Sequence, residues 1–466
     1  MLHRLTLSAL RDELASGRVS PLEAVDDTLA RIEAVNPQLN AFIAVYAERA
    51  RERAREPLSG PLAGIPVSIK DSFDIAGRPT YCGSRFRLEH GADTSATCVA
   101  RLEAAGAIVI GKTNTPEFLA NYESDNHIIG RTNNPWNLDY TPGGSSGGEA
   151  AAIAGFCSAG GMGSDGGGSV RWPAQACGIA ALKPTPGRVP ATGHYPPIAH
   201  PGGLLGVAGP MARNARDLRL LFEVVSGYDD QDPFSIPFAG PFDKQVANFA
   251  GLKIAGLKIA WADRFGTVPV SAEIAAAVQS CAHLCEKELH LDVEHWSPAG
   301  LEKSPNLWSF FFSELPAEFM RDTFQGRESD AHWTGLELLN QLEGRPLPTA
   351  RQVVENLAAR DAMRGDLLRQ MRDFRVLLWP VAGTTAFPHR SRVYHTDGRD
   401  IGLFQAMMPL LPANLLGLPA VVIPWTVSAG GLPIGIQLIG RPWEEELLLE
   451  LAIRIEEARG VFALPQ

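Results

Sequence analysis

Cysteine is scarce in this sequence, and long uninterrupted apolar runs are missing. Six cysteines among 466 residues are too few for a disulfide framework, so we expect free thiols and a reducing, cytoplasmic setting. The N-terminal segment carries acidic residues early and has no long apolar stretch, which predicts no secretory signal. Residues 401–440 contain no charged residue, but five prolines interrupt them. They therefore predict buried strands and turns, not a membrane-spanning helix.

Basic charge is also in short supply. Lys and Arg number 42 against 52 Asp and Glu, which gives a formal net charge of -10. An acidic balance argues against nucleic acid or an anionic membrane surface as the main partner. Cys281 and Cys285 lie four residues apart, but a metal site would need two further ligands nearby, so we predict half-buried thiols on a helix and no metal.

What is present is the composition of a globular protein with a large core and an order of helices and strands typical of an α/β protein. Hydrophobic residues make up 45% of the chain, which excludes a disordered protein. Helical spacing of apolar residues predicts that residues 6–58 form helices, with a break at Asn36-Pro37, and it predicts further helices in 270–290, 350–373 and 444–459. Asp93-Thr94-Ser95 predicts the cap of a helix that ends at Gly106, and 107–110, 375–379 and 420–423 predict buried strands. Residues 229–250 predict a surface loop, and one copy of the repeated GLKIA at 251–260 predicts a strand.

Glycine is concentrated in one place. Residues 142–170 contain 11 glycines in 29 positions, and the apolar residues between them argue against a linker. Glycine at that density indicates backbone held close to other backbone or to a ligand. No polar linker divides the chain, which favours one large domain.

Three short patterns fit well-known motifs, but each lacks the context that its chemistry needs. Residues 106–113 fit the phosphate-loop pattern, yet their central Ala-Ile-Val-Ile prefers a strand, which predicts a helix–glycine–strand connection. Residues 161–166 fit the dinucleotide pattern G-x-G-x-x-G, but no acidic residue occurs between Asp165 and Asp217. Residues 143–147 fit G-x-S-x-G without an apolar strand before the serine, so a Ser–His hydrolase stays open only as an alternative.

A stronger signal is an ordered set of three polar residues. Lys70 ends the apolar segment 64–70, Ser145 follows 75 residues later within 142–149, and Ser169 lies 24 residues further on, within 163–173. Each alone is ordinary, since a lysine is commonly solvated and a serine commonly sits in a turn. Together they resemble the amidase signature family. The likeness is densest over 60–215 and continues, more weakly, to the end, through segments 111–118, 130–136, 177–188, 414–420 and 431–437.

The resemblance implies a fold and a domain plan. The expected fold is an α/β/α sandwich with a large mixed β-sheet flanked by helices. Residues 1–466 would form a single amidase domain. Its parts would be an N-terminal helical segment (1–60), a signature core (61–215), a variable substrate-pocket region (216–400), and C-terminal strands and a helix that return to the core (401–466).

The resemblance also implies a Ser–cis-Ser–Lys triad. Ser169 would be the acyl nucleophile, Ser145, after a cis peptide bond, the bridging serine, and Lys70 the base. A serine hydroxyl needs a base beside it, and a lysine can serve only if burial lowers its pKa. Backbone N–H groups of Gly166, Gly167, Gly168 and Ser169 would stabilise the tetrahedral oxyanion. Asp165 and Arg171 would form a supporting ion pair.

The implied activity is hydrolysis of a carboxamide, or of an aryl amide, carbamate or ester, to an acid and ammonia or an amine. The implied partners are a small-molecule amide, with no metal or organic cofactor, no nucleic acid and no membrane; a homodimer stays open. The family's glutaminase branch, which serves in tRNA amidotransferases, tends to carry Met-Asp-Glu-Phe, where this chain has Thr-Pro-Glu117-Phe. That branch also tends to carry Gly-Gly-Ser-Ser-Gly-Gly-Ser, where this chain has Glu149 in place of the final serine. A stand-alone amidase is therefore favoured, with the glutaminase as an alternative.

Substrate contacts are the least determined feature. Leu119, Ala120 and Asn121 align with a family loop that contacts the acyl part of the substrate. The aromatic residues of the variable region are either ordinary core residues or an apolar lid over the substrate; they are Trp308, Phe310, Phe311, Phe312, Phe319, Phe324 and Trp333. Met407 and Met408 are candidates for lining the same pocket.

Overall fold

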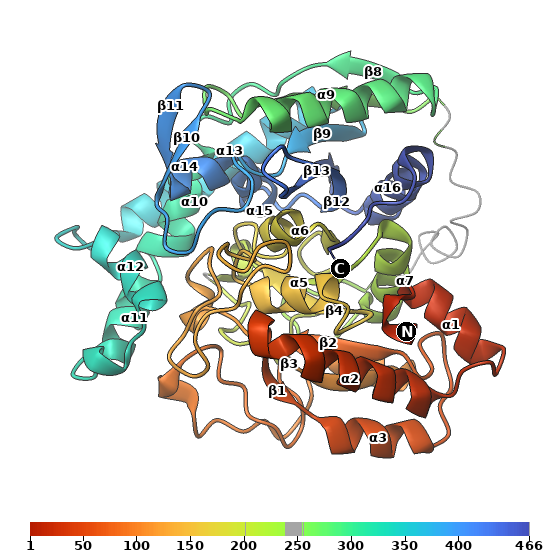
Figure 1. The fold of residues 1–466 in the computed structure, drawn as a ribbon. Coiled ribbons are helices and arrows are strands. Elements are labelled where there is room, and N and C mark those ends of the chain that lie inside the picture. The colour runs from red at the N-terminus through yellow and green to blue at the C-terminus, as the bar shows by residue number, and fades with distance from the viewer. Residues whose placement is uncertain (201, 238–253, 255, 466) are drawn as a thin grey trace.

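A mixed β-sheet of eleven strands runs through the protein in the computed structural model, which describes residues 1–200, 202–237, 254 and 256–465 (Figure 1). The strand order is β1-β3-β2-β4-β6-β5-β12-β13-β9-β7-β8. The strands are β1 (Phe42–Val45), β2 (Pro66–Lys70), β3 (Ile108–Thr113), β4 (Gly160–Asp165), β5 (Ala180–Lys183), β6 (Val207–Ala212), β7 (Lys258–Trp261), β8 (Asp292–His295), β9 (Val376–Pro380), β12 (Ala420–Val427) and β13 (Pro433–Gly440). A separate hairpin joins β10 (Val393–Thr396) to β11 (Arg399–Gly402). The predicted α/β fold with a large mixed sheet is confirmed.

Helices cover both faces of this sheet (Figure 1). They are α1 (Leu7–Ala15), α2 (Pro21–Leu39), α3 (Ala47–Arg55), α4 (Thr97–Ala104), α5 (Gly147–Ala154), α6 (Arg171–Cys177), α7 (Ala215–Val225), α9 (Ala272–Lys287), α10 (Ser304–Ser309), α11 (Ala317–Phe324), α12 (Trp333–Gln341), α13 (Ala350–Gln370), α14 (Leu403–Met407), α15 (Leu411–Leu415) and α16 (Glu445–Arg459). Phe310–Glu314 forms a single π-helical turn after α10.

The central strands are apolar on both sides because each side faces a helix layer. In β12, Val421 and Ile423 pack into the core that contains α7, α9 and α16, whereas Val422 packs with residues of α5 and α6 on the other face. This alternation follows the two-residue period of a strand. Helices α5 and α6 are therefore buried, and the glycine-rich loops before them lie at the edge of the sheet where β2 and β4 end.

Three local predictions near the N-terminus are wrong. Residues 6–58 are not all helical, because Phe42–Val45 forms β1 and pairs with β3. Helix α2 does not break at Asn36-Pro37; it continues to Leu39 and ends at Asn40, which adopts a left-handed conformation. The helix after residue 93 has Ala96 at its N-cap, with no side-chain cap, because the Ser95 hydroxyl instead accepts the N–H of Ala76.

Of the predictions for the later part of the chain, some are confirmed and others are incomplete. The final helix and strands β9 and β12 are present as expected, and Cys281 and Cys285 are both buried on α9. Residues 401–440 hold buried strands, but also the short helices α14 and α15, the second of which begins with a proline in its first turn. The second GLKIA copy contributes to β7; all of the first copy except Ile254, and most of 229–250, lie outside the described residues.

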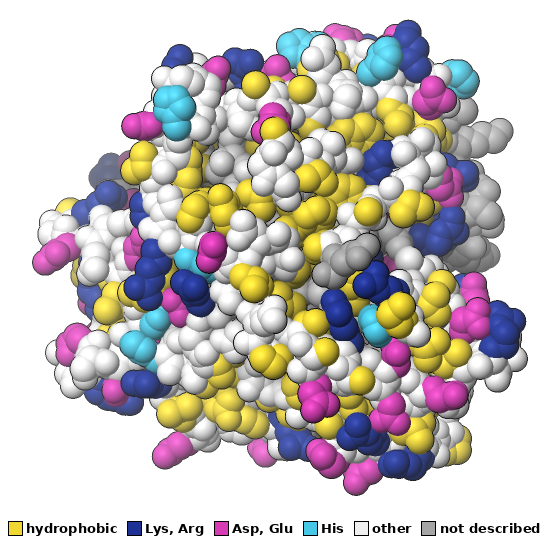
Figure 2. All heavy atoms as spheres, viewed as in Figure 1, with side chains coloured by type: hydrophobic (Ala, Val, Ile, Leu, Met, Phe, Trp, Pro, Cys, Tyr) yellow, Lys and Arg dark blue, Asp and Glu magenta, His cyan; other side chains and the backbone are white. Residues whose placement is uncertain are grey.

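The surface drawn in Figure 2 carries acidic and basic side chains side by side, without one large basic area. Among the described residues, no helix is both long and apolar enough to cross a membrane.

Candidate active site

Two neighbouring parallel strands bring Lys70 to the Gly/Ser-rich segments. Strand β2 ends at Lys70, and β4, which pairs with it in parallel, ends in Ser164-Asp165. Because parallel strands end at the same edge of a sheet, the two ends meet. The Lys70 Nζ donates to Ser145 Oγ at 2.7 Å and to Ser164 Oγ at 3.0 Å. Two of the three predicted catalytic side chains are thus in direct contact.

The Lys70 amine is fully removed from solvent. Its exposed fraction is 0%, and burial lowers its pKa from 10.5 to about 7, against the opposing influence of Cys82, Asp165 and Glu149. Desolvation disfavours the charged form of an amine. Near neutral pH, a substantial fraction of Lys70 is therefore uncharged and able to accept a proton.

The two serines lie in the wall of one cavity. Ser145 follows a cis peptide bond from Gly144, as the resemblance implies. Ser145 and Ser169 both line a cavity of about 440 Å³, and Ser169 is 7% exposed. Among the described residues, no hydrogen bond joins the Ser145 and Ser169 side chains, although Ser146 N–H donates to the Ser169 carbonyl. Catalytic hydrogen bonds in ligand-free structures are often long and tighten when substrate binds.

The loop 166–169 between β4 and α6 is held through its carbonyl groups. Trp308 Nε1 donates to the Gly166 carbonyl at 2.8 Å, and the Tyr122 hydroxyl donates to the Gly167 carbonyl at 2.9 Å. In a trans peptide the C=O and the following N–H point in opposite directions, so these bonds also orient the N–H groups of Gly167 and Gly168. Gly168 has φ of 109°, where a side chain would be strained and would collide with Leu410.

One predicted oxyanion donor is already engaged. The Gly168 N–H donates to Asp165 Oδ1 at 2.7 Å, so this structure does not leave it free for a substrate oxygen. The N–H groups of Gly166, Gly167 and Ser169 form no hydrogen bond with the described residues. The reason is local geometry, since the turn that follows β4 wraps around the Asp165 carboxylate, which also accepts the Val170 N–H.

The expected ion pair between Asp165 and Arg171 is present and fully buried. The Arg171 guanidinium contacts both carboxylate oxygens, at 3.0 and 3.1 Å, and holds the pKa of Asp165 well below its usual range despite burial. Arg171 also donates to Asn414 and to Gln437 on β13. The loop is therefore tied to segments about 250 residues away in the sequence, with the Asp165 and Arg171 charges paired in the core.

Glu149 lies behind the Lys70–Ser145 pair. Its carboxylate accepts from Ser68 Oγ at 2.5 Å and from Thr113 Oγ1 at 2.7 Å. Ser68 and Lys70 are two residues apart on β2 and so face the same side. Burial raises the pKa of Glu149 to about 7, while the two hydroxyl donors and Lys70 oppose this. A buried carboxyl group thus adjoins the proposed base.

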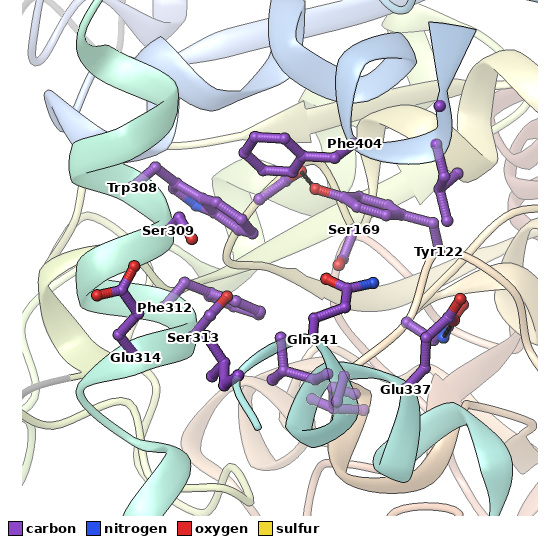
Figure 3. Close-up of a pocket in the computed structure, with 18 of the residues that line it drawn as sticks. Tyr122, Ser169, Trp308, Ser309, Phe312, Ser313, Glu314, Glu337, Gln341 and Phe404 are labelled. Atoms are coloured by element: carbon purple, nitrogen blue, oxygen red, sulfur yellow. Dashed lines mark hydrogen bonds between the residues drawn. The ribbon is translucent and has the colours of Figure 1, made fainter. Parts of the chain in front are cut away.

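Ser169 lies where two cavities meet. The first, which we name the Ser145-side cavity, is the space of about 440 Å³ that Ser145, Ser164 and Ser169 line. The second, the Trp308-side cavity, measures about 690 Å³ and is lined by Ser169, Gly167 and Trp308 among others. Figure 3 shows Ser169 within this group, with Trp308 and Phe312 on one side and Glu337 of α12 on the other.

The predicted substrate residues fall at this junction. Leu119 and Ala120 line both cavities, and Asn121 lines the Trp308-side cavity, where its amide donates to Glu337 at 2.7 Å.

The variable-region aromatics divide between cavity and core. Four of them line one or both cavities: Trp308, Phe311, Phe312 and Phe319. Phe310 and Phe324 pack in the interior, and Trp333 lies against Arg390 and Arg392. The proposal for Met407 and Met408 is wrong, because Met407 is buried in the core and Met408 faces a different cavity.

Some residues near the site were not assigned to it from the sequence. Tyr122 acts on the loop through a contact between residues 45 positions apart. His194 lines the Ser145-side cavity; its Nδ1 lies 2.7 Å from the Pro196 carbonyl, and burial lowers its pKa to about 3. It is therefore neutral near pH 7. Among the described residues, no histidine hydrogen-bonds to the side chain of Ser145 or Ser169, and no cluster of side chains suits a metal ion.

Comparisons with known proteins agree on one family. The family model described as Amidase matches residues 23–449. A glutamyl-tRNA(Gln) amidotransferase subunit of Synechococcus sp. (strain CC9605) is 34% identical over 491 residues, covering 98% of this chain and 97% of the relative. A solved structure of 6-aminohexanoate cyclic dimer hydrolase with its substrate has a TM-score of 0.88 and 30% identity, covering 100% of this chain and 99% of that one. The corresponding amidotransferase subunit of Thermotoga maritima has a TM-score of 0.76 and 25% identity, covering 100% and 98%.

Proposed function

This chain belongs to the amidase signature family, whose members act on amide carbon–nitrogen bonds, and from that premise we propose that it is an amidase that hydrolyses a carboxamide to a carboxylic acid and an amine through an acyl-Ser169 intermediate. The observation that carries the proposal is the fully buried Lys70 amine, 2.7 Å from Ser145 Oγ and in the same site as Ser169. A neutral amine in that place is a base, and a hydroxyl can pass a proton on because it both donates and accepts.

The reaction begins with acylation. Ser169 Oγ attacks the amide carbon, its proton passes to Ser145, and Ser145 gives its own proton to Lys70. The tetrahedral intermediate carries a negative oxygen, which N–H groups of Gly166, Gly167 and Ser169 would stabilise; one such donor typically lowers the barrier by about 3 kcal/mol. The C–N bond then breaks, and the leaving nitrogen takes a proton from Ser145, which is replenished from Lys70.

Deacylation repeats the sequence with water. Water loses a proton to the same relay as its oxygen attacks the acyl carbon, and the Ser169 Oγ–carbon bond breaks as Ser169 regains a proton. The acid leaves and Lys70 is again neutral, so atoms and charges balance over the cycle. A relay that returns a proton to nitrogen matters for amides because an unprotonated amide nitrogen is a poor leaving group.

A glutaminase that works within an amidotransferase is the second candidate, because curated relatives such as the Synechococcus protein are named as amidotransferase subunits at 34% identity. Two observations favour a stand-alone amidase. The TM-score is higher with the cyclic dimer hydrolase (0.88) than with the Thermotoga protein (0.76), and Glu149 stands at the end of the Gly-Gly-Ser-Ser motif. A glutaminase would release ammonia from free glutamine and depend on a partner chain, whereas a stand-alone amidase turns over simple amides alone.

The test is mass spectrometry after labelling with a fluorophosphonate probe, with Ser169→Ala as the variant. We expect the wild type to be modified on Ser169. The variant should lose both labelling and turnover, the latter by about four to six orders of magnitude. Its melting temperature should stay nearly unchanged, since the Ser169 hydroxyl forms no hydrogen bond with the described residues.

Ser158→Ala is the matched control. Ser158 is also buried, but it precedes β4 and so lies at the opposite end of that strand. This variant should label and turn over as the wild type does. Labelling at another serine, or turnover retained by Ser169→Ala, would refute the nucleophile assignment.

A further inference from the structure

The two cavities that meet at Ser169 differ in which catalytic groups they reach. They share five lining residues: Leu119, Ala120, Ser169, Phe312 and Leu338. Ser145 and Ser164 line only the Ser145-side cavity. A substrate whose carbonyl carbon lies at Ser169 must therefore place its acyl part in one cavity and its amine part in the other.

The proton relay decides which part goes where. When the C–N bond breaks, the nitrogen must take a proton from Ser145, and a proton donor has to lie within about 3 Å of the atom it protonates. Since Ser145 lies in the wall of the Ser145-side cavity alone, the leaving nitrogen and its substituent belong on that side. The acyl part then extends into the Trp308-side cavity, past Tyr122 and Phe404.

The Ser145-side cavity is apolar. Its described lining includes no lysine, arginine or glutamate. The Asp165 carboxylate is neutralised by Arg171, and His194 is neutral near pH 7. Aromatic and aliphatic side chains make up most of the wall: Phe118, Ile198, Phe311, Phe312, Pro316, Phe319 and Met320.

The Trp308-side cavity has a different character. Its wall combines the aromatic rings of Trp308, Phe312 and Phe404 with four charged side chains, which are Glu314, Glu337, Arg345 and Arg392. Arg392 donates to Glu337 and also to Glu123, and Arg345 donates to Glu314, so these charges are largely paired. This cavity can therefore hold an acyl group with polar substituents more readily than the Ser145-side cavity can.

Resting on the proposed amidase function, we infer that the Ser145-side cavity binds the amine half of the substrate and selects an uncharged, apolar, ring-sized amine. The substrate class is thus a secondary amide of such an amine. A primary carboxamide would leave an apolar space of about 440 Å³ unfilled, and a cationic amine would lose its hydration without gaining a free counter-ion.

A panel of acetamides with one acyl group tests the inference in the full-length enzyme. N-benzylacetamide and N-(4-aminobutyl)acetamide both release an alkylamine, so their intrinsic reactivity is similar, but only the first carries an apolar, uncharged substituent. We expect kcat/KM to be at least about tenfold higher for the benzyl amide than for the aminobutyl amide or acetamide itself, which is the range that apolar pockets provide.

Two variants assign the cavities directly. Met320→Ala enlarges the Ser145-side cavity, and Phe404→Ala enlarges the Trp308-side cavity. Met320→Ala should reduce the benzyl-to-primary amide preference about tenfold. It should leave the rate of acetyl-enzyme hydrolysis unchanged, because the amine has left by then. Phe404→Ala should leave that preference unchanged and alter selectivity among acyl groups. Phe319→Ala, at a largely exposed position on α11, repeats the Met320 test if the first variant folds poorly.

The outcomes separate this inference from the proposed function. If the aminobutyl amide or acetamide is the better substrate, or if Met320→Ala changes acyl selectivity or acetyl-enzyme hydrolysis, the cavity assignment is overturned while the amidase function stands. If no amide is hydrolysed and no acyl-Ser169 forms, the proposed function itself fails.

Discussion

Replacing Lys70 by methionine should make the protein more stable at low pH and inactive at every pH. Burial lowers the pKa of Lys70 from 10.5 to about 7, so the folded state disfavours a charge that the unfolded chain carries freely. Between these two pH values the unfolded chain holds a proton that the folded one lacks, and stability of the wild type rises with pH. Below pH 7 the full cost of about 5 kcal/mol is present, at 1.36 kcal/mol per pH unit.

The quantity to be measured is the difference in unfolding free energy between Lys70→Met and the wild type, compared at two pH values. The packing change cancels in this comparison. Lys70→Met removes the titration of Lys70, and the change in packing that it causes is the same at each pH. Its stability relative to the wild type should therefore fall by about 3 kcal/mol between pH 6 and pH 9. Urea unfolding at both pH values gives this number. In the wild type, kcat/KM should rise with pH and reach half its maximum near pH 7, where Lys70 loses its proton.

Lys183→Met provides the matched control. Lys183 is the second fully buried lysine whose pKa burial lowers to about 7, but its amine donates to the Pro184 carbonyl and lines neither cavity. It should show the same pH-dependent stability difference while keeping turnover. If the stability of Lys70→Met relative to the wild type is the same at pH 6 and pH 9, or if kcat/KM is flat from pH 5.5 to 8.5, the buried-base reasoning is refuted.

Two further changes probe the surroundings of the site. Trp308→Phe keeps an aromatic ring but removes the hydrogen bond to the Gly166 carbonyl. We expect kcat to fall about tenfold, which corresponds to the loss of one hydrogen bond, and KM to change little. Steady-state kinetics in which only KM changes would contradict this. Glu149→Gln removes a negative charge that raises the pKa of Lys70. The midpoint of the pH profile of kcat/KM should therefore move to lower pH. A shift to higher pH would show that Glu149 does not act on Lys70 through its charge.

The candidate catalytic residues could be located in the sequence because local motifs, and the family resemblance that they carry, mark their positions. Lys70 closes an apolar strand, and Ser145 and Ser169 lie in glycine-rich turns whose order along the chain is distinctive. The mixed sheet follows from the same resemblance. The failed predictions concern features that depend on tertiary contacts. The Ser95 hydroxyl accepts the Ala76 N–H instead of capping its helix. Residues 42–45 form a strand because they pair with β3.

The architecture of the pocket could not be predicted from the sequence. Trp308 and Tyr122 donate hydrogen bonds to the glycine loop from positions 142 and 45 residues away in the sequence. The glycine-rich sequence of the loop itself does not indicate these partners. Likewise, nothing in the sequence indicates that the Gly168 N–H is consumed by Asp165. The division into two cavities depends on how α10, α11 and α12 pack over the loop, and no periodicity encodes that packing.

The long-range ties of Arg171 have a consequence for biosynthesis. The loop 166–169 is held by a guanidinium whose partners include Asn414 and Gln437, about 250 residues further along the chain. A ribosome-bound chain that has emerged only as far as residue 400 contains Lys70, Ser145 and Ser169, yet lacks two of the groups that hold the loop in place. The loop can therefore be held in this way only after residues 414 and 437 have been synthesised.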